Sequence, residues 1–152
     1  MRLLPAIETM LAPAPGLRRM ADPMLRVLTS LIFIIGGLGH FGQHQIMLDR
    51  MEQSPWRDLI IAIADPSLLL WLSGAVFVVF GITLALGLST RLSALLLFVT
   101  LVPITITIHI APDHIGPLFK NIAIMGALLF IAARGPGAYA LDNRWQRQND
   151  TS

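Results

Sequence analysis

The stretch that decides the fold is SLLLWLSGAVFVVFGITLALGL, from Ser67 to Leu88, which contains no charged residue and no histidine. A helix needs about 20 largely apolar residues to cross a bilayer core that is about 30 Å thick. Three further stretches have this character, namely residues 24–41, 92–111 and 118–133. The pattern predicts an all-α fold, an integral membrane four-helix bundle.

The composition of the whole chain agrees with a membrane protein. Of its 152 residues, 55% are hydrophobic and only 13% are charged, whereas soluble domains carry about 25% charged residues. Because so few charges cannot cover a surface that faces only water, part of the surface must face lipid. The formal net charge is +2, but the basic residues are scattered, which argues against nucleic acid as a partner. The chain has no cysteine, which excludes disulfides and thiolate metal sites.

We expect three segments along the chain. Residues 1–23 contain several prolines and no clean apolar core, which predicts an interfacial or disordered tail and not a removable signal peptide. Residues 24–142 form the four-helix domain, and residues 143–152 form a polar C-terminal tail. In the longest loop, residues 42–66, the segment WRDLIIAIAD predicts contact with the membrane surface. Arg26 is expected to snorkel from the first helix, and Pro103 predicts a kink in the third.

The positive charges predict the orientation of the bundle. Cytoplasmic ends of transmembrane helices carry an excess of arginine and lysine. With both termini in the cytoplasm, most basic residues fall on the inner side and few on the outer side. The inner residues are Arg2, Arg18, Arg19, Arg26, Arg91, Arg134, Arg144 and Arg147, and the outer ones are Arg50, Arg57 and Lys120.

Small residues recur along three of the predicted helices. Glycine and alanine let helix backbones approach closely in lipid, where the hydrophobic effect does not drive association. These positions therefore predict helix packing. They are Gly36, Gly37 and Gly39, then Gly74, Gly81 and Ala85, then Ala123, Gly126 and Ala127.

A group of histidines and other polar residues falls at the outer end of the predicted bundle. The first helix ends near His40 and His44, which share one face if the helix continues through Gly42. The third helix ends at His109. Ionisable residues in a membrane are functional hypotheses, less strongly so at the interface. The group comprises His40, His44, His109, Asp113, His114, Lys120 and Asn121.

Three interpretations of this group are open. In the first, the histidines only form hydrogen bonds between helices or contact lipid head groups. In the second, they line a pocket for a quinone-like head, because histidine can accept and donate a proton near neutral pH; its binding residues would be His40, His44, His109, Lys120 and Asn121. In the third, a metal or haem binds, for which HxxxH is a weak motif; its ligands would be His40, His44, His109 and His114. No nucleophile–base–acid triad is visible, so no catalytic residue is predicted.

Several motifs, taken in order, resemble those of the DoxX family of small bacterial membrane proteins. They are GGLGHF in the first helix, GAVFVVFGITLALGLSTRLSALLLF across the second and third, the histidine that closes the third, and KNIAIMGALLFIAARGPGAYALD at the end. The resemblance covers about residues 24–142. The matching positions are Gly37, His40, Phe41, Arg91, His109, Asn121, Gly135, Pro136, Gly137 and Asp142.

The resemblance implies a multi-pass protein of the bacterial inner membrane. Members of the family include small subunits of thiosulfate:quinone oxidoreductases and proteins linked to quinone or catechol detoxification and oxidative stress. We therefore expect a membrane subunit in quinone-linked redox metabolism that has no intrinsic cofactor, binds a quinone near the outer histidines and works with other membrane or redox subunits. The alternative is a structural or accessory subunit of a larger membrane complex. Either role makes a subunit the expectation over a self-sufficient enzyme, and no catalytic role transfers from the family.

Overall fold

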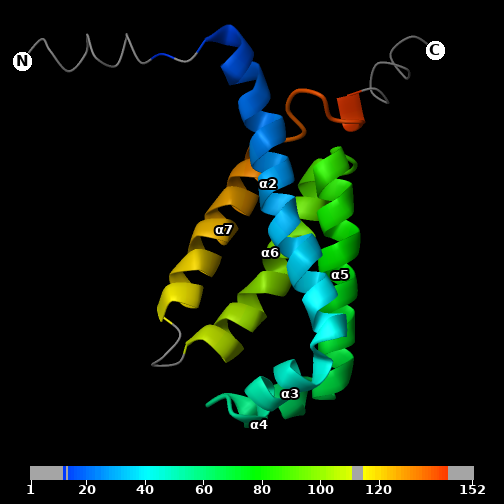
Figure 1. The fold of residues 1–152 in the computed structure, drawn as a ribbon, viewed down its shortest axis with the longest axis vertical. Helices are drawn as coiled ribbons and strands as arrows, with labels where there is room; N and C mark the ends of the chain where they lie inside the picture. The colour runs from blue at the N-terminus through cyan, green and yellow to red at the C-terminus, as the bar shows by residue number, and fades with distance from the viewer. Residues whose placement is uncertain (1–11, 13, 111–114, 144–152) are drawn as a thin grey trace, which may run out of the picture.

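The computed structural model describes residues 12, 14–110 and 115–143. These residues form helices α2 (Pro15–Gly42), α3 (His44–Glu52), α4 (Arg57–Ile63), α5 (Pro66–Leu86) and α6 (Thr90–Ile104), the π-helical turn η1 (Thr105–His109), and helix α7 (Ile115–Arg134). Within this part of the chain, four helices are long and apolar enough to cross a membrane: α2, α5, α6 continued by η1, and α7. The predicted all-α architecture with four membrane-spanning helices is confirmed (Figure 1).

The first membrane-spanning helix is longer than predicted. It begins at Pro15 and not at Met24, and has 28 residues, or about 42 Å at 1.5 Å per residue, against a hydrocarbon core of about 30 Å. A run of apolar residues shows which part of a helix can lie in lipid, but the helix itself can continue beyond that run. Proline starts a helix readily because its missing N–H would have no helical partner there. Residues 15–23, predicted to belong to an interfacial or disordered tail, are therefore helical, and residues 1–11 and 13 of that tail lie outside the described residues.

The other predicted helices also differ at their ends. The second begins at Pro66, where Asp65 accepts a hydrogen bond from the Leu68 N–H at 3.0 Å and caps the helix. The third begins at Thr90, and its last turn is the π-helix η1. The fourth begins at Ile115 and ends at Arg134. At α5 the Asp65 cap places the start of the helix at Pro66, one residue before the predicted apolar stretch.

The predicted loop at residues 42–66 contains the short helices α3 and α4, at the end of the molecule opposite the start of α2 (Figure 1). Met51 of α3 and Ile60 of α4 form a small buried cluster with Leu70 of α5. Ile61 and Ile63 of α4 remain exposed. An amphipathic segment of this kind suits the membrane surface, as its sequence predicts.

Helices α2 and α5 pack closely because glycines lie where they meet. A Cβ atom at Gly37 would lie 2.8 Å from the carbonyl oxygen of Gly74, and one at Gly81 would lie 2.9 Å from Cγ1 of Ile34. The packing role predicted for these glycines is confirmed. Gly36 and Gly126, in contrast, face open space.

The core of the bundle lies between the four long helices. Its fully buried side chains include Phe33 of α2, Leu84 of α5, Leu97 of α6 and Leu128 of α7. The outer faces are also apolar; Ile35, for example, is 68% exposed. Large apolar side chains cover an outer surface in this way when the surrounding solvent is lipid.

The long helices form two neighbouring pairs, α2 with α5 and α6 with α7. The pairs lie close together at the end where residues 135–143 cross the bundle, and they diverge toward the end that carries α3 and α4 (Figure 1). This divergence positions the site described next.

Candidate functional site: a cavity at the histidine end

A cavity of about 510 Å³ lies where the two helix pairs diverge, with α3 and α4 contributing to its lining. Sites for small molecules commonly have volumes of about 300–1,000 Å³ and apolar walls with a few polar groups. Most residues that line this cavity are apolar. The polar ones are His40, Arg50, Ser73, Thr100, Thr107, His109, Lys120 and Asn121.

The structure brings four of the five predicted binding residues to this cavity. His40 comes from α2, His109 from η1, and Lys120 and Asn121 from α7. The fifth, His44, is not among the lining residues. Residues that are far apart in sequence thus meet at one cavity because α2, η1 and α7 reach the same end of the bundle (Figure 1).

His40 is buried at the wall of the cavity, with 8% of its surface exposed. Its Nδ1 lies 3.0 Å from Oγ of Ser73 and 3.4 Å from the carbonyl oxygen of Leu70. The Ser73 hydroxyl donates its own hydrogen to that carbonyl at 3.1 Å. Because a carbonyl oxygen only accepts, this network assigns the proton to Nδ1 and leaves Nε2 as the acceptor of the neutral ring.

A second polar chain joins α7 to η1. The buried Asn121 amide donates to Oγ1 of Thr105 at 3.0 Å, and the Thr105 hydroxyl donates to the Leu101 carbonyl at 2.7 Å. The same turn carries His109. Pro103, where the sequence predicts a kink, lies within α6, and the π-helical turn begins two residues later. Such turns occur often at functional sites, because they re-aim side chains within a helix.

Arg50 and Ser73 line the cavity but were not predicted from the sequence. Arg50 follows Met47 by three residues on α3, and both contribute to the lining. Residues three apart on a helix share a face. This spacing could have indicated that Arg50 faces the same side as Met47. It does so only if residues 44–52 are known to form a helix.

His44 lies at the same end of the molecule but faces α5. Its Nε2 lies 2.9 Å from Oγ of Ser67, and its ring packs against Trp71 with centroids 5.3 Å apart. The face that His40 and His44 would share is absent, because α2 ends at Gly42 and Gln43 separates it from α3. The condition for a shared face, a helix that continues through Gly42, is therefore not met.

The alternative metal site receives no support from the described residues, among which no group of three or more histidine, cysteine, aspartate or glutamate side chains could hold an ion. His40 and His44 each have a serine partner on α5. His114 and Asp113, which the sequence places nearby, lie outside the described residues.

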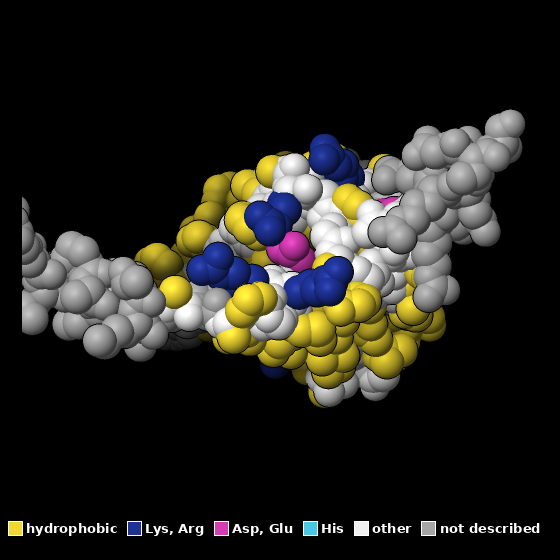
Figure 2. Space-filling view, turned by 90° about the horizontal axis from the view of Figure 1, so that it is seen from above, with side chains coloured by type: hydrophobic (Ala, Val, Ile, Leu, Met, Phe, Trp, Pro, Cys, Tyr) yellow, Lys and Arg dark blue, Asp and Glu magenta, His cyan; other side chains and the backbone are white. Residues whose placement is uncertain are grey.

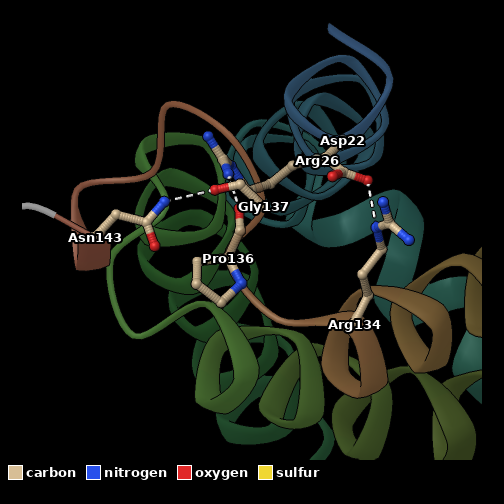
Figure 3. Close-up of polar contacts among 6 residues, drawn as sticks. All are labelled: Asp22, Arg26, Arg134, Pro136, Gly137 and Asn143. Atoms are coloured by element: carbon tan, nitrogen blue, oxygen red, sulfur yellow. Dashed lines mark hydrogen bonds and ion pairs between the residues drawn. The ribbon is translucent and has the colours of Figure 1, made fainter. Parts of the chain in front are cut away.

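The opposite end of the bundle is basic and closely tied together. Figure 2 shows this end with basic side chains gathered around an acidic one. Arg26 is only 3% exposed and donates hydrogen bonds to the carbonyl oxygen of Ala85 and to that of Pro136, which Figure 3 shows. The predicted snorkelling of Arg26 is therefore wrong: its guanidinium has buried acceptors inside the protein. Beside it, Arg134 and Asp22 form an ion pair at 2.7 Å (Figure 3).

The residues after α7 fold back over this end. The Asp142 carboxylate accepts hydrogen bonds from the Ser89 N–H at 2.7 Å, the Thr90 N–H at 2.9 Å and the Thr90 hydroxyl at 2.8 Å. Burial raises the pKa of Asp142, but these bonds and the Arg26 charge outweigh it and hold the pKa below the ordinary value. Gly137 beside it accepts from the Asn143 amide (Figure 3). This segment stabilises the link between α5 and α6.

The residues of the last motif that resembles the family therefore lie at both ends of the molecule. Asn121 contacts the cavity, while Gly135, Pro136, Gly137 and Asp142 belong to the folded-back segment.

A sequence profile of the DoxX family matches residues 21–110. The chain belongs to the DoxX family. This DoxX protein is also similar, at 34% identity over 131 residues, to inner membrane protein YphA of Escherichia coli (strain K12), with 78% of this chain and 86% of the relative covered.

A second relative is an uncharacterized protein of Haemophilus influenzae. It is 32% identical over 129 residues, with 80% of this chain and 87% of the relative covered. No solved structure is significantly similar to the chain. The family, the inner-membrane relative and the four membrane-spanning helices identify a multi-pass protein of the bacterial inner membrane.

Proposed function

We propose that this DoxX protein is a membrane subunit in quinone-linked redox metabolism and binds a quinone-like head in the cavity at the histidine end. The observation that carries the proposal is the composition of the cavity wall. About 510 Å³ of largely apolar space is combined with His40, His109 and Asn121. An apolar body and a small polar head are the properties that such a wall selects.

His40 has the geometry to exchange a proton with a bound head. Its Nδ1–H is held by Ser73 and Leu70, so Nε2 offers a lone pair. A quinol hydroxyl would donate to Nε2, and the ring would take up one of the two protons that the quinol releases on oxidation, while the second passes to water. The two electrons would pass to a partner subunit, because this chain has no cysteine for an iron–sulfur cluster and no dinucleotide fingerprint.

The arginine distribution supports an orientation for this chemistry. Arg18, Arg19, Arg26, Arg91 and Arg134 lie at the end opposite α3 and α4. Under the positive-inside rule that end faces the cytoplasm. The cavity would then lie toward the outer leaflet, where a quinone head reaches it from the membrane.

A thermal-stability assay with decylubiquinone tests this function. The full-length protein is purified in mild detergent, and the unfolding midpoint is followed as ligand is added. We expect an increase that His40→Ala abolishes and His44→Ala retains, because His44 lies at the same end but outside the cavity lining. A midpoint that decylubiquinone leaves unchanged, or equal loss in both variants, would contradict the proposal.

The second candidate is an accessory subunit without a ligand. It is favoured by one observation: on α7, Ala123 and Gly126 are exposed, and a Cβ at Gly126 would meet nothing within 4 Å. Small residues on a lipid-facing helix permit close contact with another helix. Co-purification of a stoichiometric partner that Gly126→Leu removes and His40→Ala retains would favour this role.

A further inference from the structure

The charged side chains that line the cavity all have one sign. Arg50 of α3 and Lys120 of α7 line it together with His40 and His109, and none of the described lining residues is acidic. A neutral quinone needs hydrogen-bond donors but no fixed cation. The two permanent charges therefore call for a separate explanation.

Three described carboxylates at this end have partners on or next to their own helices. Asp49 accepts a hydrogen bond from Gln45 on α3, and Asp58 pairs with Arg57 on α4. Asp65 caps α5. The ion pairs among the described residues are Arg57–Asp58 and Arg134–Asp22, so within that part of the chain neither Arg50 nor Lys120 has a carboxylate partner.

The two cations are also unexpected from topology. The end with α3 and α4 carries few basic residues, namely Arg50, Arg57 and Lys120, as the positive-inside rule predicts for the outer side. Two of these three line the cavity. Basic residues are thus scarce at this end, yet two of the three lie at the cavity.

We infer that the cavity selects an amphiphile with an anionic head, a phenolate or carboxylate oxyanion held by Arg50 and Lys120, with its apolar body between the diverging helix pairs. Both residues are exposed, so their charged groups are available to a ligand at the edge of the cavity, and charge-assisted hydrogen bonds to oxyanions are strong. This inference rests on the proposed function for the place of the ligand and adds the charge of its head. An ionised hydroxyquinone and a fatty acid share this chemistry.

Two matched pairs of probes test the inference on the full-length protein in detergent. The first pair is a 2-hydroxy-3-alkyl-1,4-naphthoquinone, which is ionised at neutral pH, and its neutral 2-methoxy ether. The second pair is palmitate and methyl palmitate. Affinities are measured for the wild type, Lys120→Gln, Arg50→Gln and the control Arg57→Gln, whose arginine lies at the same end but does not line the cavity.

We expect the acid of at least one pair to bind about tenfold more tightly than its ester or ether, the scale of a charge-assisted hydrogen bond. Lys120→Gln and Arg50→Gln should each reduce this preference, and Arg57→Gln should keep it. Preference for palmitate over its ester, with no binding of either naphthoquinone, would support the anion site and contradict the quinone. Binding of the naphthoquinones with no acid preference in either pair would overturn the anion site while the quinone function stands. Binding of none of the four probes would overturn both.

Discussion

Substitution of Gly37 by alanine tests the contact on which the cavity depends. Gly37 lies where α2 meets α5, one helical turn before His40. The new Cβ would lie 2.8 Å from the Gly74 carbonyl oxygen and 2.9 Å from Cβ of Phe77 and Cγ2 of Val78. Because two of these atoms are backbone or next to it, rotation of a side chain cannot relieve the contact. The two helices must separate.

The distances set the size of the effect. Ordinary van der Waals contact begins at 3.4 Å, so α2 and α5 must move apart by roughly 0.5 Å in an interior that is already close-packed. Overpacking of this kind costs about 1–3 kcal/mol. Replacing glycine by alanine within a helix offsets about 0.5–1 kcal/mol of this. We expect a net loss of up to about 2.5 kcal/mol in the free energy of unfolding.

Unfolding by SDS in mixed micelles, followed by tryptophan fluorescence, measures this loss. Trp71 of α5 reports on the contact, because its ring lies 5.0 Å from that of Phe41 on α2. Gly36→Ala is the matched control: it adds the same atom one residue earlier, where nothing lies within 4 Å. Its stability should stay the same or rise by up to about 1 kcal/mol. If Gly37→Ala is as stable as Gly36→Ala, the reasoning about the α2–α5 contact is refuted.

Two further predictions concern single polar groups. The folded pKa of Asp142 lies below the ordinary value of 3.8, so the stability that its carboxylate contributes is present above the unfolded pKa and is lost as the pH falls below about 4. Between about pH 6 and about pH 3, SDS unfolding should show a larger loss of stability for the wild type than for Asp142→Asn. Equal losses in the two proteins would contradict this. Thr105→Val removes the acceptor of the buried Asn121 amide and should cost about 1–3 kcal/mol, whereas Thr107→Val, whose hydroxyl bond is exposed, should change stability by less than about 0.5 kcal/mol. Equal effects in that pair would exclude a structural role for the buried amide.

The sequence predicted several residues of the candidate site but not the full set of side chains that line the cavity. His40, His109, Lys120 and Asn121 could be grouped because helix direction places them at one end. His44 was grouped with them, since position along the chain says nothing about the break at Gln43 or the Ser67 contact. Arg50 was missed, because the direction in which α3 folds over the bundle depends on contacts of Met51 and its neighbours with α5.

The burial of Arg26 also could not be predicted from the sequence. A charge near the end of an apolar stretch predicts snorkelling to water, yet this guanidinium is buried against Ala85 and Pro136. Its acceptor Pro136 lies 110 positions further along the chain. No local pattern around Arg26 contains that carbonyl, so its burial could not be read from the sequence.

The sequence by itself determined that the protein lies in lipid, that four helices span the membrane, and that His40, His44 and His109 lie at one end, because these follow from runs of apolar residues whose length matches the bilayer. Only the tertiary structure decided that α2 and α5 approach through Gly37 and Gly74, that the helix pairs diverge, and that a cavity opens between them. Hydropathy reports the preference of each residue for lipid or water. The space between helices depends instead on which side chains meet across them, and that is a property of the assembled bundle.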